Sequence, residues 1–331
     1  MANIAKKYFN EEISRLQGLN SKAYELSTMA RNLNLLALQG TLAPVFHRES
    51  EVKSIMKLML RRTKPNALLT GPAGCGKTAI AEALAIHIAE QRVAWLSEQA
   101  KADREYDKAC ANWDALADLK TTKDLPPAPE RRIVPKPPLC DAVIYDLSLN
   151  SLVSGTRYRG EFEAKLQNVM NECKKNPDII LFIDEIHQMN TLGMAEGAGG
   201  MGQILKPALA RAEIKVLGAT TTEESAMLKR DKALARRFSE IEVLPLSGAK
   251  AISTAESVLA DYEKFHSIMV SGVSAEQILE MVNFHIGGVF PNNFIDVVDE
   301  TMSGARFEGK TSISMSEIKQ TLSRMTGTII L

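Results

Sequence analysis

Short apolar runs alternate with amphipathic stretches along most of the chain. Four runs are continuously apolar instead of alternating with polar residues, which is typical of parallel strands buried on both faces. Helix-favouring segments separate these runs, and the order strand, helix, strand, helix predicts an α/β fold with a parallel sheet covered by helices. The four runs are NALLTG (66–71), AVIYDL (142–147), IILFID (179–184) and KVLGAT (215–220).

The pattern is different at the two ends of the chain. Residues 1–40 predict a helical extension, and from about residue 247 helical signals dominate, which predicts a small all-helical domain over 247–331. The large α/β domain between them spans residues 41–246, and an insert at about 93–139 interrupts it.

The insert has two parts with different patterns. The helix over 78–90 ends in a break, after which residues 95–120 predict a separate charged amphipathic helix. The segment PPAPERRIVPKPP (126–138) has too many prolines for a helix or a sheet interior, so we expect it to be extended. Exposed Tyr106 and Trp113 would let the insert dock a partner or adaptor. The simpler interpretation is a helix packed on its own domain, followed by a rigid connector.

The composition excludes several classes of protein. The chain of 331 residues carries 40 basic and 40 acidic residues, so no overall charge draws it to nucleic acid or to a membrane surface. Its longest apolar run, IILFI, is far too short to cross a bilayer, and the amino terminus lacks the apolar core of a signal peptide. The four cysteines are widely spaced, as in reduced cytosolic proteins. We therefore expect a soluble cytoplasmic protein.

A phosphate-binding loop follows the first predicted strand. The segment GPAGCGKT fits the pattern G-x-x-x-x-G-K-[ST] and lies between a strand and a helix, as the mechanism requires. Backbone N–H groups and the helix amino terminus would cradle the phosphates of ATP. Lys77 would reach the β- and γ-phosphates, and Thr78 would offer its hydroxyl to Mg²⁺; a tight turn that matches by chance is the alternative. The predicted nucleotide-binding residues of the loop are Gly71, Pro72, Ala73, Gly74, Cys75, Gly76, Lys77, Thr78 and Ala79.

Two carboxylates at the end of IILFIDE supply the chemistry that a phosphate loop lacks. Asp184 would hold the Mg²⁺ shell, and Glu185 would orient or deprotonate the attacking water. A strand that ends in solvated acids is the alternative interpretation. Together with the phosphate loop, these residues predict hydrolysis of Mg-ATP.

Cys75 stands inside the phosphate loop, close to a helix amino terminus. That position is expected to lower the pKa of its thiol, which would suit a redox switch. The simpler interpretation is a small residue that the loop tolerates.

A tyrosine stands between two arginines in LVSGTRYRGEFEAKL (152–166). Glycines on both sides let the backbone bend, and the residues that follow favour a helix with acidic residues in its first turn. We therefore expect Tyr158, flanked by Arg157 and Arg159, to lie on a short exposed loop that grips a ligand.

With these motifs in place, the chain resembles the Clp-type AAA+ ATPases, in particular the first ATPase module of the ClpA and ClpB unfoldases. The resemblance covers about residues 31–92 and 140–328 and leaves out the insert. It implies an AAA+ α/β domain followed by a small helical lid, in a stand-alone single-module protein. The matching segments include RRTKPNALLTGPAGCGKTAIAEALA, LVSGTRYRGEFEAKL, IILFIDEIHQM, ILKPALARAEIKVLGATT, DKALARRF and VFPNNFIDVVDE.

The resemblance implies further catalytic residues. Thr221 matches the sensor that contacts the γ-phosphate or its water, and Thr220 is the neighbour with which it could be confused. Arg236 and Arg237 match the paired arginines that reach into the nucleotide site of the next subunit. A bare RRF is also typical of a solvated helix end.

The adenine pocket and the lid show both matches and departures. Val45 and Phe46 match the segment that lines the adenine pocket. The family usually has a glycine where His47 stands and a basic residue where Asn293 stands. A second sensor cation is therefore not assigned. The apolar tail TIIL would be either a partner contact or a last strand.

The resemblance also implies a ligand for the loop that contains Tyr158. Tyr158 matches the pore-loop aromatic that holds a polypeptide in the channel of a ring, and a tyrosine packed at a helix start is the alternative. Arg157 and Arg159 would contact the substrate or neighbouring loops. The glycine-rich segment GMAEGAGGMG (193–202) resembles a second pore loop.

These observations predict a ring- or spiral-forming homo-oligomer, a hexamer by resemblance, that uses ATP and Mg²⁺ to unfold or remodel a polypeptide. One alternative is a nucleic-acid-associated AAA+ switch or loader, with the arginines of the tyrosine loop on phosphates. The balanced charge of the chain and the aromatic residue at the centre of the tyrosine loop disfavour this nucleic-acid alternative. Another alternative is an assembly scaffold that hydrolyses ATP slowly.

Overall fold

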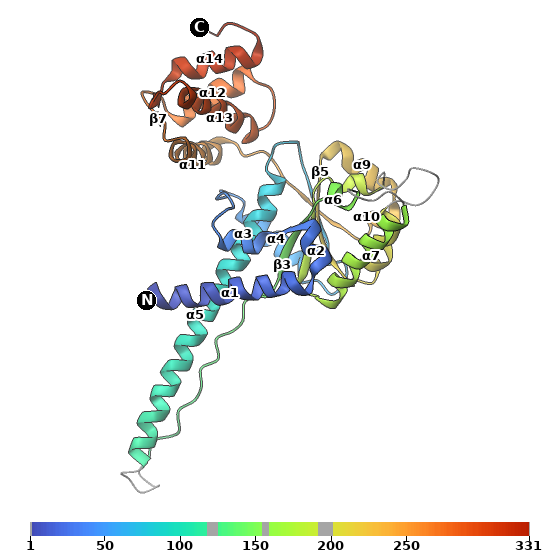
Figure 1. Ribbon diagram of the computed structural model, residues 1–331, viewed down its shortest axis with the longest axis vertical. Coiled ribbons are helices and arrows are strands. Elements are labelled where there is room, and N and C mark those ends of the chain that lie inside the picture. The colour runs from blue at the N-terminus through green and yellow to red at the C-terminus, as the bar shows by residue number, and fades with distance from the viewer. Residues whose placement is uncertain (1, 118–124, 154–158, 191–200, 331) are drawn as a thin grey trace. The chain divides into compact units, whose positions relative to one another are not determined.

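The computed structural model describes residues 2–117, 125–153, 159–190 and 201–330. Helices and short strands alternate along the first two thirds of the chain, and helices dominate the rest (Figure 1). The elements are α1 (Ala2–Lys22), α2 (Tyr24–Met29), β1 (Ala30–Asn32), α3 (Leu33–Leu38), α4 (Glu49–Met59), β2 (Ala67–Thr70), α5 (Lys77–Ala117), β3 (Val143–Leu147), α6 (Leu149–Val153), α7 (Arg159–Lys175), β4 (Ile179–Ile183), the 3₁₀ helix η1 (Ile186–Asn190), α8 (Met201–Ala210), β5 (Lys215–Thr220), α9 (Thr222–Arg230), α10 (Lys232–Ala235), β6 (Ser239–Glu242), α11 (Gly248–His266), β7 (Met269–Val270), α12 (Ala275–His285), α13 (Asn292–Phe307), β8 (Ser312–Ile313) and α14 (Met315–Thr326).

The central sheet has the strand order β1-β3-β4-β5-β2-β6. Strand β3 pairs in parallel with β4, and β2 pairs in parallel with both β5 and β6, whereas β1 runs antiparallel to β3. The four strands predicted from apolar runs are confirmed, and every residue of β2 and β4 is buried as the runs imply. The edge strands β1 and β6 were not predicted, because ARN and SEIE hold too few apolar residues to stand out.

The chain forms two compact units, each built from several stretches. The first unit comprises residues 1–43, 82–182 and 207–216, and the second comprises 44–81, 183–206 and 217–331. The division into a helical extension, a large domain and a small helical domain stays a prediction.

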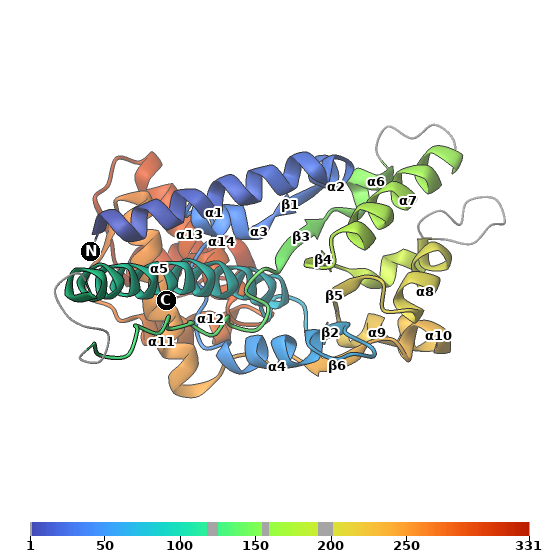
Figure 2. The same cartoon turned by 90° about the horizontal axis from the view of Figure 1, so that it is seen from below.

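Polar side chains as well as apolar packing hold the elements of the first unit together. Helix α1 lies against α3 (Figure 2). The carboxylate of Glu172 on α7 accepts hydrogen bonds from the backbone N–H groups of Glu25 and Leu26, at 3.1 and 2.8 Å, and so caps α2. The guanidinium of Arg92 pairs with both Glu12 of α1 and Asp141, which precedes β3.

Helix α5 is a single helix of 41 residues, so the predicted break after residue 90 is wrong. Residues 91–94 contain neither glycine nor proline, and nothing in them stops a helix that has already begun. The distal part of α5 and the extended return segment 125–139 together form a projection that we call the arm (Figure 1). The prediction of an extended proline-rich segment is confirmed.

Hydrogen bonds hold the return segment against α5. The indole of Trp113 donates to the carbonyl of Pro126 at 2.8 Å, and the indole of Trp95 donates to the carbonyl of Val134 at 3.2 Å. The backbone N–H of Val134 in turn donates to the side chain of Gln99 at 3.1 Å. Trp113 was expected to be an exposed anchor for a partner, but its indole N–H makes a hydrogen bond within the arm.

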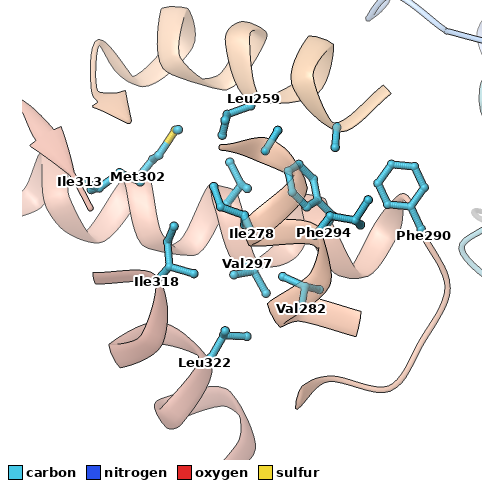
Figure 3. Close-up of a cluster of buried hydrophobic side chains, with 14 of the residues drawn as sticks. Leu259, Ile278, Val282, Phe290, Phe294, Val297, Met302, Ile313, Ile318 and Leu322 are labelled. Carbon is cyan, nitrogen blue, oxygen red and sulfur yellow. The ribbon is translucent and has the colours of Figure 1, made fainter. Parts of the chain in front are cut away.

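The helical part after residue 247 has a core of its own. Apolar side chains from α11, α12, α13 and α14 converge in it, as the close-up in Figure 3 shows. Capping boxes start α12 at Ser274 and α14 at Ser314. The predicted helices are confirmed, and the short parallel pair β7–β8 is added to them. Residues 328–330 form no strand.

None of the helices in the described ranges combines the length and the apolar character that a membrane crossing needs.

Candidate nucleotide-binding site

The predicted phosphate loop connects β2 to α5 in the second unit. Gly74 has a φ of 78°, which L-residues rarely adopt, and a Cβ there would lie 2.9 Å from the Cβ of Asn292. At Gly71 a Cβ would lie 2.3 Å from the carbonyl oxygen of Val243, which allows no side chain at all. The backbone thus needs glycine at these two positions for steric reasons.

Lys77 opens helix α5 and turns its ammonium back over the loop. Its Nζ donates to the carbonyl of Gly71 at 3.0 Å and to that of Pro72 at 2.8 Å. The side chain is buried, so its charge acts in a medium that screens it poorly. This places a cation beside the N–H groups at the amino terminus of α5, where a phosphate would bind.

Thr78 and Asp184 come together from separate segments of the chain. The Thr78 hydroxyl donates to Oδ2 of Asp184 at 2.6 Å, and Oδ1 of Asp184 accepts from the N–H of Glu185 at 2.9 Å. Hydroxyl and carboxylate oxygens are the hard donors that Mg²⁺ accepts alongside water and phosphate. The residues therefore fit the ion that the motif implies.

Glu185 follows Asp184 with its backbone in the left-handed region, at a φ of 48°. A non-glycine residue with such a backbone is uncommon, because the conformation costs free energy. The side chain is exposed, and Gln188 of η1 donates a hydrogen bond to its carboxylate. This geometry turns an acid toward the space in front of the phosphate loop.

These groups line one cavity of about 560 Å³ within the second unit. Asp184, Glu185 and both threonines at the end of β5 contribute to its wall, together with residues 73, 74 and 76–79 of the loop. The helical part contributes Pro291, Asn292 and Ile295, and none of these three residues is basic. The cavity thus joins most of the nucleotide-binding residues that the sequence predicted.

Other predicted residues do not line this cavity. Val45 and Phe46 are half-buried in the segment before α4, Arg236 is exposed at the end of α10, and Arg237 is half-buried beside it. Their roles stay predictions. Among the departures from the family, His47 has a positive φ of 57°, and Asn293 is buried.

Cys75 corrects one expectation. Its thiol is fully buried, and this burial raises the pKa of the Cys75 thiol above its usual value despite the nearby Lys77 and Arg48. The lowered pKa expected from the helix amino terminus is therefore wrong, because burial disfavours the thiolate more than the cations favour it.

The tyrosine loop is not described. Arg157 and Tyr158 lie outside the described residues, as do residues 193–200 of the predicted second pore loop. Arg159 is the first residue of α7.

Sequence reasoning missed Arg48, a buried residue just before α4. Its Nη2 donates to the carbonyl of Cys75 at 2.7 Å, and its Nη1 donates to the carbonyl of Leu244 at 2.9 Å and to Glu51 at 2.9 Å. Burial raises the pKa of Glu51, but hydrogen bonds from Ser50 and Arg48 outweigh this effect and lower it. No sequence pattern signals partners that are backbone carbonyls.

Two further residues were missed, His187 on η1 and Glu224 on α9, of which Glu224 lines the cavity. His187 Nδ1 lies 3.0 Å from the Thr220 hydroxyl and 3.2 Å from Oε2 of Glu224. Glu224 also accepts a hydrogen bond from the Thr221 hydroxyl at 2.8 Å. The sequence signal for Glu224 was its place three residues after Thr221, which is the spacing of a capping box.

Comparisons with known proteins agree with this geometry. Residues 67–246 match the family described as "ATPase family associated with various cellular activities (AAA)". The chain is 33% identical over 330 residues to the ClpC ATP-binding subunit of ATP-dependent Clp protease from Staphylococcus aureus and to that from Staphylococcus epidermidis. Each alignment covers 98% of this chain and 35% of the relative, so the chain spans about a third of their length.

Solved structures of similar fold include an Hsp104–ADP complex from S. cerevisiae, with 28% identity and a TM-score of 0.69 over 92% of this chain and 46% of that one. A closed-state reconstruction of Hsp104 with ATPγS and FITC casein has 28% identity and a TM-score of 0.67, over 92% and 45% of the two chains.

Proposed function

Because this chain belongs to the AAA family of ATPases, as an ATP-hydrolysing enzyme that resembles one Clp/Hsp100 module, we propose that it uses Mg-ATP hydrolysis to remodel polypeptides. The observation that carries the proposal is the contact between Thr78 and Asp184 at 2.6 Å, inside a cavity that also exposes Glu185 to the phosphate loop. These are the parts that hydrolysis of a nucleotide requires, and they come from separate segments.

Each residue has a distinct task in this proposal. Loop N–H groups and Lys77 bind the β- and γ-phosphates, while Thr78 and Asp184 hold Mg²⁺. When bound, the ion offsets negative charge on the phosphates. Glu185 orients the attacking water and accepts its proton. Asn292 and Ile295 line the cavity from the helical part.

Assembly into a homo-oligomer, with a hexamer as the expected form, is the second part of the proposal. The exposed position of Arg236 outside its own cavity supports delivery of the guanidinium to a neighbouring subunit, with Arg237 beside it. Phe265, Phe284 and Phe307 of the helical part are 72%, 84% and 93% exposed, which is unusual for phenylalanine and supports contacts between subunits.

The substrate in this proposal is an unfolded polypeptide gripped by Tyr158 between Arg157 and Arg159. Support comes from the similarity to Hsp104, which one solved structure holds together with casein. The arm is the proposed site for an adaptor or partner, since Ile133 in its return segment is 78% exposed. Removal of residues 95–135 is expected to leave ATP turnover in place and to abolish partner binding.

Steady-state ATP turnover tests the whole proposal. It is measured for the wild type alone, with unfolded casein, and with single-stranded or duplex DNA, in parallel with Tyr158→Ala and Glu185→Gln. We expect casein to raise turnover, Tyr158→Ala to lose only this stimulation, and Glu185→Gln to bind nucleotide without turnover. Activation by DNA would support the nucleic-acid switch instead. Assembly without any stimulation would support the scaffold.

A further inference from the structure

Arg236 and Arg237 follow α10, a helix of only 4 residues, and lead into β6. A helix this short has too few internal hydrogen bonds to keep a fixed position by itself. At its amino end, the carboxylate of Asp231 accepts from the backbone N–H groups of Ala233 and Leu234, at 3.1 and 3.2 Å. The position of the two arginines therefore depends on contacts made beyond the carboxyl end of α10.

Asn66, the residue before β2, supplies such contacts. Its side-chain Nδ2 donates to the carbonyl of Arg237 at 3.1 Å, and its own carbonyl accepts from the N–H of Ser239 at 3.0 Å. Asn66 is fully buried, so loss of its amide would leave the carbonyl of Arg237 without this donor in a poorly hydrated place. Arg61 adds a hydrogen bond from its Nη1 to the Ser239 hydroxyl at 3.0 Å, but this bond is exposed. Asn66 thus ties the turn between α10 and β6 to β2.

The arginines and the phosphate loop lie at opposite ends of β2. Strands β2 and β6 run in parallel (Figure 2), with Ala67 opposite Ser239 and Thr70 opposite Glu242. Arg237 comes before β6 at the amino end of the pair, whereas the phosphate loop follows Thr70 at the carboxyl end. The 4 residues of β2, at about 3.3 Å each, put about 13 Å between the two ends. The arginines therefore start at the edge of the sheet away from their own cavity, which suits delivery to a neighbouring copy.

We propose that Asn66 is a positioning residue that holds the segment of Arg236 and Arg237 against β2, and so sets where the guanidinium enters the nucleotide site of the next subunit. The inference rests on the homo-oligomer with arginines supplied in trans that is proposed above. Such an arginine acts on the charge of the transition state, so a displaced segment lowers kcat in the neighbouring subunit. The phosphate loop of the altered subunit still binds nucleotide.

Kinetics of single variants test the first consequence. Asn66→Ala is expected to lower kcat by about tenfold to a hundredfold, with nearly unchanged affinity for ADP, because a small misplacement of a catalytic group costs this much. Asn34→Ala is the matched control. Asn34 is also buried, and its Nδ2 donates to the carbonyl of Ala142 at 3.2 Å, but it lies in the first unit. This control is expected to lose stability in urea to a comparable extent and to keep the kcat of the wild type.

Mixed oligomers separate a defect in trans from a defect in cis. Glu185→Gln subunits are expected not to hydrolyse ATP, yet they carry intact arginines. In a large excess of them, most Asn66→Ala subunits have a neighbour that supplies an intact arginine. Their turnover is therefore expected to recover most of the value of wild-type subunits diluted in the same way. The double variant Arg236→Ala/Arg237→Ala should recover equally, whereas Thr78→Ala, whose defect lies in its own site, should not. If Asn66→Ala does not fold, Asn66→Ser takes its place, since a serine side chain is too short to make the same bond.

Three outcomes would overturn the inference. One is a wild-type kcat in Asn66→Ala, and another is an equal fall of kcat in Asn34→Ala at an equal loss of stability. The third is a mixture that restores the double arginine variant but not Asn66→Ala. In each case, ATP turnover by the wild type would leave the proposed function standing. A wild-type kcat in the double arginine variant alone would instead overturn the proposed delivery in trans, and the inference with it.

Discussion

Replacing Arg48 by methionine would remove a buried guanidinium while keeping much of its apolar stem. Arg48 is 5% exposed and donates to the carbonyls of Cys75 and Leu244 and to the carboxylate of Glu51. Breaking a buried charge pair by removing one partner costs about 3–5 kcal/mol, because the other charge and its acceptors are left without compensation. Glu51 is itself 16% exposed on its side chain, which puts the expected loss at about 3 kcal/mol, the lower end of this range.

Arg31 provides a matched control with similar geometry and a different environment. Its Nη2 lies 2.6 Å from Oδ2 of Asp146, but its side chain is 59% exposed. A surface pair contributes about 0–1 kcal/mol, so Arg31→Met is expected to change stability little. Arg48→Lys is expected to recover only part of the loss, since an ammonium cannot reproduce the fork that reaches two carbonyls and a carboxylate.

Urea unfolding of the three variants and the wild type measures these losses, with ADP affinity as a second readout. Arg48→Met is expected to weaken ADP binding more than Arg31→Met does, because the carbonyl of Cys75 belongs to the phosphate loop. Equal destabilisation by Arg48→Met and Arg31→Met would refute the argument from burial. Unchanged ADP affinity in a destabilised Arg48→Met protein would show that the arginine supports the fold without shaping the loop.

Three further predictions concern single side chains. Gly71→Ala is expected to abolish ADP binding, because the added Cβ would lie 2.3 Å from the backbone oxygen of Val243 and neither backbone can move aside. Isothermal titration with ADP measures this loss, and retained affinity would contradict the prediction. Hydrogen bonds from Ser314 lower the pKa of Glu317 to about 2, so the stability that this carboxylate adds is present above its unfolded pKa near 4.5 and is lost as the pH falls toward 2. Circular dichroism during acid titration should show that loss, and Glu317→Gln should remove it. The buried thiol of Cys75 is expected to react with a disulfide reagent at pH 8 only after denaturation, and rapid labelling of the folded chain at Cys75, located by peptide mapping, would contradict its burial.

The sequence predicted the strands that are buried on both faces, because such strands need long apolar runs. Strands β1 and β6 are short and polar, and they form by pairing with neighbours whose position no local pattern reveals. The continuity of α5 was missed for a related reason. A change in the apolar pattern at residue 90 looked like a helix end, although residues 91–94 hold nothing that ends one.

The same distinction applies to the candidate site. The phosphate loop and Asp184 were predictable because their chemistry dictates residue types at fixed spacing. Arg48 was not, since its carbonyl partners lie 27 and 196 positions away in the chain. His187 Nδ1 lies beside a hydroxyl 33 positions away, and only the folded geometry separates the surroundings of Thr220 from those of Thr221.

Helix α5 also has a mechanical consequence, because a single unbroken helix follows the phosphate loop and continues to Ala117 in the arm. Its 41 residues, at about 1.5 Å per residue, give a rod of about 60 Å. A tilt of about 5° at one end of a rod of this length corresponds to a displacement of about 5 Å at the other end. The hydrogen bonds from Trp95 and Trp113 tie this part of the helix to the return segment and are expected to stiffen it against bending.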